Sequence, residues 1–148
     1  MKAYSVSGSN ASASSNHTLV NVIGSTSVRP RLFDLVVGSS ATPADQAMQL
    51  SVSRFTTVGT AGSSPTPTPL DPGDIAAVAT AGAAHSGEPG YTVGLLSKIS
   101  LNQRATFRWV ATPGAELVSP ATASNGIGLY LVSATTALIE DGTIVWYE

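Results

Sequence analysis

Residues 48–53 read MQLSVS, and apolar and polar side chains alternate at every step of this stretch. A period of two places Met48, Leu50 and Val52 on one face of an extended strand and leaves the other face to water. The alternation stops after residue 53, because Arg54 falls on the apolar side, which predicts a bulge or a strand end there. The stretch therefore predicts a half-buried strand of an antiparallel sheet.

Similar patterns recur along the chain between clusters of Gly, Pro, Ser and Asn. The longest predicted strand covers residues 91–101, and one of its faces carries Tyr91, Val93, Leu95, Ile99 and Leu101. Shorter strands are predicted at residues 4–7, 18–23, 32–37, 106–110 and 127–133, which are rich in residues that suit a pleated surface. About eight strands without alternating helices predict an all-β fold, namely an antiparallel β-sandwich with a Greek-key, jelly-roll-like topology.

The C-terminal region contains the dipeptide Asp141-Gly142 between two β-rich arms. This dipeptide is typical of a two-residue type I′ turn, so the pattern predicts a hairpin over residues 137–146. In that register Ile139 would oppose Ile144, and Ala137 would oppose Trp146, as cross-strand apolar pairs.

A chain of 148 residues has the usual size of one domain and can bury a hydrophobic core. We therefore predict one β-sandwich domain over residues 1–148. Its core is predicted to contain large apolar residues on the inward faces of the strands: Phe33, Leu35, Val37, Leu50, Val52, Val93, Leu95, Ile99, Phe107, Trp109, Ile139, Ile144 and Trp146.

Two segments are predicted to leave this core. Residues 1–16 are predicted to form an extended N-terminal arm, because residues 7–16 contain no large apolar side chain. Residues 59–73 form a Pro-rich excursion, in which alternate prolines favour an extended rod. Segments of this kind gain order by lying on a neighbour, so candidate capsid or subunit contacts are Ser7, Asn10, Asn16, Pro65, Pro67, Pro69 and Asp71.

Charged residues make up only 11% of the chain, against roughly 25% in ordinary soluble domains. With a formal net charge of −2, little electrostatic repulsion keeps copies apart, so self-association is expected. The seven Lys and Arg residues are scattered, which argues against nucleic-acid binding. No apolar run is long enough to span a bilayer, and the first residues do not resemble a signal peptide, so neither membrane insertion nor secretion is expected.

The sequence offers few groups for chemistry. It has no cysteine, and its two histidines, His17 and His85, lie in no metal-binding spacing. Asp71 and Asp74 flank Pro72-Gly73, where a turn explains both acids. We therefore expect no catalytic residue, no metal site and no cofactor. The alternation of aromatic and basic residues at 107–109 could stack on a base or a sugar, but core packing explains it better.

Three blocks of the sequence resemble a group of tailed-bacteriophage proteins. The blocks are residues 38–45, residues 69–72 and residues 102–110, and the similarity runs from about Arg29 to Gly128. Proteins of this group are similar to small virion components, and the nearest functional class is that of the capsid decoration, or cement, proteins. The blocks carry no known chemistry.

The resemblance implies a jelly-roll-like module, commonly a homotrimer, on the outer surface of the capsid. Such a module binds the major capsid protein at junctions between capsomers and stabilises the shell, and the virion assembles in the host cytoplasm. Many weak contacts in a symmetric array would supply the avidity.

Two alternatives stay open. The chain could be a module of a phage tail, neck or fibre that binds a host receptor or glycan, since jelly-roll modules serve that purpose as well. It could also be a small hydrolase or isomerase on a cupin-like barrel, which would need clustered histidines and acids as metal ligands.

Overall fold

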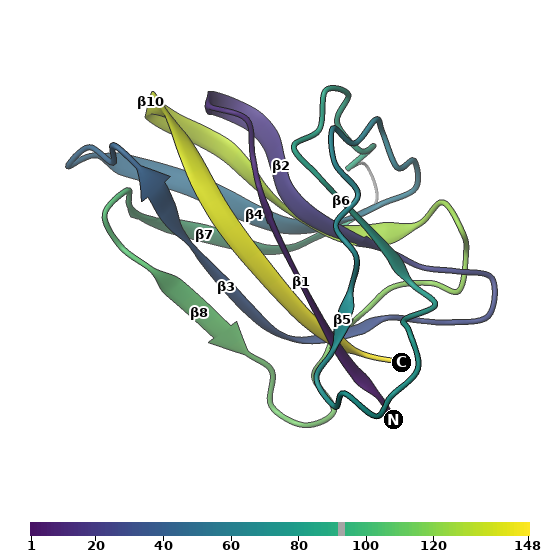
Figure 1. Cartoon of the computed structure of the whole chain (residues 1–148). Helices are drawn as coiled ribbons and strands as arrows, with labels where there is room; N and C mark the ends of the chain where they lie inside the picture. Colours follow the sequence, from purple (N-terminus) through teal and green to yellow (C-terminus); the bar gives the residue numbers. More distant parts are fainter. Residues whose placement is uncertain (92–93) are drawn as a thin grey trace.

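The computed structural model describes residues 1–91 and 94–148. The chain forms an antiparallel sheet that curls over itself (Figure 1). Its strands are β1 (Ala3–Ser9), β2 (Ala13–Ile23), β3 (Arg31–Ala41), β4 (Ala47–Phe55), β5 (Thr68–Pro69), β6 (Thr80–Ala83), β7 (Leu95–Asn102), β8 (Phe107–Val110), β9 (Leu117–Val118) and β10 (Gly126–Tyr147). The described residues contain no helix, so the all-β prediction is confirmed, with ten strands instead of about eight.

Strand β10 connects the two halves of the sheet. Its first half pairs with β2 and β4, and its second half pairs with β1 and β3. Between Ser133 and Leu138, five steps of β10 face only two steps of β2, from Ser15 to Ala13. This irregularity lets the strand bend sharply, as the ribbon does beside the label β10 in Figure 1. It also changes the core-facing positions from odd numbers, such as Leu131, to even numbers, such as Leu138.

The predicted hairpin over residues 137–146 is wrong. Asp141 and Gly142 lie inside β10, where Gly142 pairs with Gly8 on one side and with Val37 on the other. A tight turn at this point would break both sets of backbone hydrogen bonds. Packing explains the glycine, because a Cβ at position 142 would lie only 2.9 Å from Leu129 Cδ2 in the opposite half of the strand.

The core lies between the two halves of the sheet. Its largest fully buried side chains include Trp146, Tyr4, Phe55, Leu19, Leu129 and Ile144. Of the residues predicted for the core, the structure buries Leu35, Val37, Leu50, Val52, Ile99, Ile144 and Trp146. Phe33, Phe107, Trp109 and Ile139 are half-buried. Ile139 pairs with Ala41 instead of Ile144, Trp146 pairs with Tyr4 and Leu32 instead of Ala137, and Val93 lies outside the described residues.

Leu95 is a correction to the predicted core, because 54% of its surface is exposed. A register shift in the pairing of β4 with β7 is the cause: Val52 pairs with Ser97 and the next residue, Ser53, pairs with Leu95. Leu96 is the additional residue of this bulge, and it packs against the core in place of Leu95.

The predicted free N-terminal arm is also wrong. Residues 3–9 form β1, which lies between β5 and β10, and its inward side chains Tyr4 and Val6 are buried. The residues from position 7 onward are small because the backbone passes close to other strands there. A Cβ at Gly8 would lie 2.6 Å from Ala83 Cβ and 2.8 Å from the Leu19 carbonyl oxygen. The absence of large side chains therefore reflects close packing in this segment.

Replacing Gly8 by alanine is expected to lower the free energy of unfolding by about 1–3 kcal/mol, because the added methyl group has no space. Equilibrium denaturation in urea would measure this change. Ser7→Ala is the matched control, since Ser7 is exposed and its side chain, among the described residues, bonds only to Thr143 Oγ1 at 2.8 Å. Equal stability of the two variants would contradict close packing at Gly8 and favour the predicted extended arm.

The Pro-rich excursion lies against the molecule. Thr68 and Pro69 pair with Ser5 and Tyr4, and the Leu70 N–H donates to the Ala3 carbonyl at 2.8 Å. The prolines at positions 65, 67 and 69 are half-buried, whereas the threonines at 66 and 68 are exposed. The alternation of the rod thus turns its prolines towards the sheet and its threonines towards solvent.

Candidate functional site

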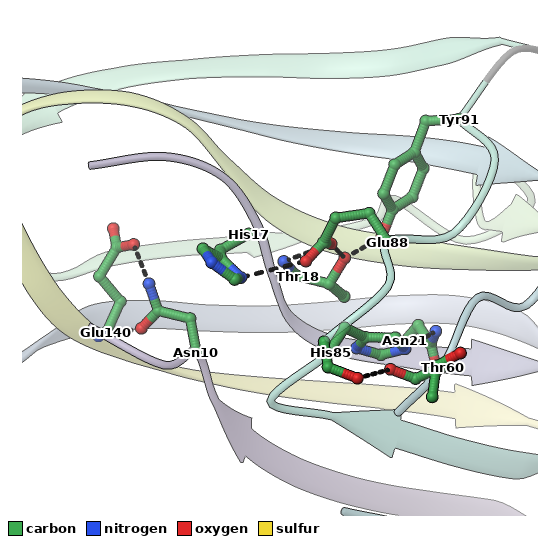
Figure 2. A network of polar contacts seen from close by, with 10 residues as sticks. Asn10, His17, Thr18, Asn21, Thr60, His85, Glu88, Tyr91 and Glu140 are labelled. Carbon is green, nitrogen blue, oxygen red and sulfur yellow. Dashed lines mark hydrogen bonds and ion pairs between the residues drawn. The ribbon is translucent and has the colours of Figure 1, made fainter. Parts of the chain in front are cut away.

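The candidate site lies on the outer face of β2 and of the first half of β10. In this region Thr18 pairs with Tyr130, and Asn21 pairs with Gly128. Val20 and Leu129, which lie next to these pairs, point into the core. The opposite face of the two strands is therefore turned towards the segment that follows β6. Residues 84–91 of that segment cross over this face and bring polar side chains to it (Figure 2).

Glu88 is the central acid of the site. Its Oε2 accepts hydrogen bonds from the Thr18 N–H at 2.9 Å and from Thr18 Oγ1 at 2.5 Å. Its Oε1 lies 3.0 Å from His17 Nδ1, although the ring N–H is not aligned as a hydrogen bond. The carboxylate is therefore held in one orientation by β2, and it brings together residues 70 positions apart in the sequence.

Tyr91 is held by a hydrogen bond and by aromatic stacking. Because the Thr18 hydroxyl donates its hydrogen to Glu88, the Tyr91 hydroxyl donates to Thr18 Oγ1, at 2.7 Å. The Tyr91 ring stacks on Tyr130 with centroids 4.2 Å apart. Burial raises the pKa of the Tyr91 phenol far above its usual range, and the hydrogen bond with Thr18 opposes this shift only in part. Tyr91 therefore stays protonated and serves as a wall of the site.

Beside these residues the surface forms an open hollow of about 250 Å³. It is lined by Asn16, Glu88, Pro89, Tyr91 and Tyr130. Asn16 has a φ of 48°, a left-handed conformation that asparagine tolerates better than most residues. An aromatic wall, a carboxylate and an amide around one hollow suit a ligand with hydroxyl groups and an apolar face.

Gly128 makes room for Tyr91, because a Cβ at this position would lie 2.2 Å from the Tyr91 hydroxyl. We expect Gly128→Ala to displace the ring from Tyr130 and to lower the free energy of unfolding by about 1–3 kcal/mol. Near-ultraviolet circular dichroism would report the loss of tyrosine packing. Gly73→Ala is the control, since only Asp71 Oδ1, at 3.3 Å, would meet its Cβ. An unchanged spectrum for Gly128→Ala would contradict this account of the site.

The second histidine is a structural residue. His85 is only 2% exposed, and Asn21 Nδ2 donates to its Nε2 at 3.1 Å, while Asn21 Oδ1 accepts from the Gly82 N–H at 2.8 Å. Burial lowers the pKa of His85, which favours the neutral ring. Within residues 1–91 and 94–148, no group of three or more His, Cys, Asp or Glu side chains is placed to hold a metal ion.

A second polar cluster was missed at the sequence level. Glu140 is fully buried on the core side of β10, and Asn10, 4% exposed, lies beside it. Asn10 Oδ1 accepts from the Glu140 N–H at 2.7 Å, and Asn10 Nδ2 donates to Glu140 Oε2 at 3.4 Å. Burial raises the pKa of Glu140 to about 7. The sequence does contain a signal for this acid: Glu140 has the same even-numbered parity as the buried Ile144 and Trp146, so an alternating strand turns all three side chains inward.

The structure separates the predicted contact residues. Ser7 is exposed on β1, Asn10 is buried beside Glu140, and Asn16 lines the hollow. Asp71 is exposed, and its Oδ1 accepts from the Gly73 N–H at 2.8 Å. The prolines at 65, 67 and 69 face the sheet, so these residues do not form one surface.

No protein-family model, curated protein or solved structure matches the chain. The resemblance to phage decoration proteins therefore stays a prediction. The described residues include no helix with the length and hydrophobicity that crossing a membrane requires.

Proposed function

We propose that the chain is a non-enzymatic virion structural protein of the capsid decoration type. In this proposal it binds the major capsid protein on the outer surface of the head at capsomer junctions and stabilises the shell. The jelly-roll-like sandwich topology and the homotrimer that the sequence resemblance implies are parts of the same proposal.

The observation that carries the proposal is a set of large apolar side chains that the fold leaves exposed. Leu70, Ile75, Val78, Leu95 and Val110 are between 46% and 65% exposed. Each lies on or beside a segment that is fastened to the sheet, so these side chains are presented in fixed positions. Large apolar groups on a weakly charged surface favour contacts with other proteins.

The exposed face of the Pro-rich segment is the proposed contact with the shell, since β1 holds this segment rigidly through Thr68 and Pro69. Purified protein would be titrated onto heads that lack it, and cryo-electron microscopy would locate the bound copies. We expect saturable binding at capsomer junctions. A protein bound only at the tail, or not bound at all, would overturn the proposal.

A paired set of variants tests the contact. Arginines at the exposed positions Thr66 and Thr68 are expected to lower occupancy, because they insert charges into the contact. Arginines at the exposed positions Ser14 and Ser15 of β2 add the same charge elsewhere and are expected to leave occupancy unchanged.

A second candidate function is glycan binding by a tail, neck or fibre module. The hollow lined by Tyr91, Tyr130, Glu88 and Asn16 favours it, because such sites combine an aromatic wall with groups that bind hydroxyls. A glycan array with the wild type and Tyr130→Ala tests this function. Saturable binding that the substitution abolishes would favour adhesion over shell stabilisation.

A further inference from the structure

The half of the sheet built on the second half of β10 has two different ends. Its strand order is β5-β1-β10-β3, with β8 and β9 on the far side of β3. Among the described residues, β5 pairs only with β1, and β8 pairs only with β3. Strands β1, β10 and β3 lie between β5 and β8 (Figure 1), so one copy cannot bring its own two ends together.

The β5 end carries exposed apolar side chains and the acid Asp71, while the nearby Lys2 is paired with Asp74 at 3.6 Å. Leu70, Ile75 and Val78 are 54%, 65% and 46% exposed, and Asp71 is exposed beside them. This segment is held in place, because the Leu70 N–H donates to the Ala3 carbonyl and Tyr4 Oη donates to the Ile75 carbonyl at 3.1 Å. Its apolar side chains are therefore ordered without being covered by this chain.

The β8 end is apolar and basic. Val110 is 55% exposed, and the Arg108 side chain is 64% exposed although it pairs with Asp34 at 2.6 Å. Arg104 is exposed in the preceding turn and has no carboxylate within 4.0 Å among the described residues.

A cavity of about 120 Å³ lies behind this end, and most of the side chains that line it are apolar, among them Leu96, Trp109 and Leu117. Cavities of about 150 Å³ accept a molecule the size of benzene, so this one has the size for a single apolar side chain.

We propose that copies of this chain associate head to tail, with the β5 end of one copy against the β8 end of the next. Asp71 then faces Arg104 and Arg108, while Leu70 and Ile75 cover Val110 and the mouth of the cavity. The opposite charges fix the partner and the orientation, and the apolar side chains leave water. Pro69 has no N–H to donate, so side chains dominate this contact over a continued backbone ladder.

The contact joins two different surfaces, so every copy keeps one free end of each kind until a ring closes. A closed ring exposes neither apolar end, which makes closure the stable outcome for a soluble assembly. This inference deepens the homotrimer of the proposed function by naming the two surfaces that meet, and it needs no capsid.

Sedimentation equilibrium of the purified full chain tests the contact. We expect the wild type to self-associate, and we expect Asp71→Arg and Arg104→Asp each to weaken association by about tenfold or more, because like charges then meet. The double variant restores an opposite-charge pair between positions 71 and 104 in every contact but leaves Arg108 facing an arginine, so it is expected to recover part of the association. High salt is expected to weaken the wild-type contact.

Lys98→Glu is the control, because Lys98 is exposed on β7, in the other half of the sheet, and this variant is expected to associate like the wild type. A monomeric wild type, unaffected single variants, or a double variant that fails to recover would each overturn the inference. Circular dichroism spectra equal to that of the wild type show that the variants fold. A chain that forms rings but leaves phage heads bare would refute the decoration function and keep this contact.

Discussion

Replacing Glu140 by glutamine is expected to raise the free energy of unfolding above pH 7 by up to about 3 kcal/mol. Glu140 is fully buried, and its Oε1 has no hydrogen-bond partner in the described part of the chain. Burial raises the pKa of this carboxyl to about 7 from an ordinary value of 4.5, and each unit corresponds to about 1.4 kcal/mol. Glutamine has nearly the same shape and carries no charge at any pH.

The sign follows from which state holds the proton more tightly. Because the pKa of Glu140 is higher in the folded chain, the folded state binds the proton better, and the contribution of Glu140 to stability is most favourable below about pH 4.5. That contribution falls as the pH rises and reaches its lower level above about pH 7. The glutamine variant lacks this fall, so the two stability curves should diverge across that window. Urea denaturation at several pH values would measure both curves.

Glu116→Gln provides a control of the opposite sign. Backbone N–H groups of Glu116 and Gly114, together with Arg31, lower the pKa of Glu116, so its charged form stabilises the fold. Its contribution is lost as the pH falls, and glutamine at this position should reduce stability at neutral pH. Parallel curves for the wild type and Glu140→Gln between pH 4.5 and 7.5 would show that Glu140 is not desolvated.

The sequence predicted those strands well in which the local pattern and the packing agree. Residues 48–53 alternate, and β4 buries Met48, Leu50 and Val52 as that alternation requires. The other face is not left to water as predicted, because Ser51 and Ser53 are buried as well. At Gly142 the local sequence pattern and the tertiary packing favour different structures. Turn statistics favour a hairpin, but the glycine is needed where Leu129 from the other half of β10 approaches. That approach is a tertiary contact, and no short window of sequence contains it.

The candidate site was harder to predict for a similar reason. Nothing in the sequence around Glu88 indicates that this acid will meet Thr18. The contact depends on how the segment after β6 crosses β2, which the order of the strands determines. The small residues in the first sixteen positions were interpreted as an arm that leaves the core, but the structure packs them closely. Small residues suit both cases, because a backbone that passes close to other strands, as at Gly8, and a loosely held segment favour the same residue types.

Trp146→Ala is expected to lower the free energy of unfolding by about 3–5 kcal/mol, the largest loss we predict for a single substitution. The side chain is fully buried, and its ring lies 6.0 Å from that of Tyr4. Removal leaves a cavity between β1, β3 and β10, which pair at this point. Chemical denaturation would measure the loss, and a decrease below about 1 kcal/mol would contradict the placement of Trp146 in the core.

The same substitution should loosen the segment that presents Ile75 and Val78. Trp146 Nε1 donates to Glu148 Oε1 at 3.2 Å, and the Glu148 carboxylate accepts from the Val78 and Ala79 N–H groups at 2.9 Å each. Trp146→Phe removes only the hydrogen bond and part of the ring, so a smaller loss of stability is expected. Faster amide exchange at Val78 and Ala79 in both variants would show that the indole N–H orders this segment. Exchange that increases only in the alanine variant would assign that role to the ring, and the apolar β5 end would then depend on core packing.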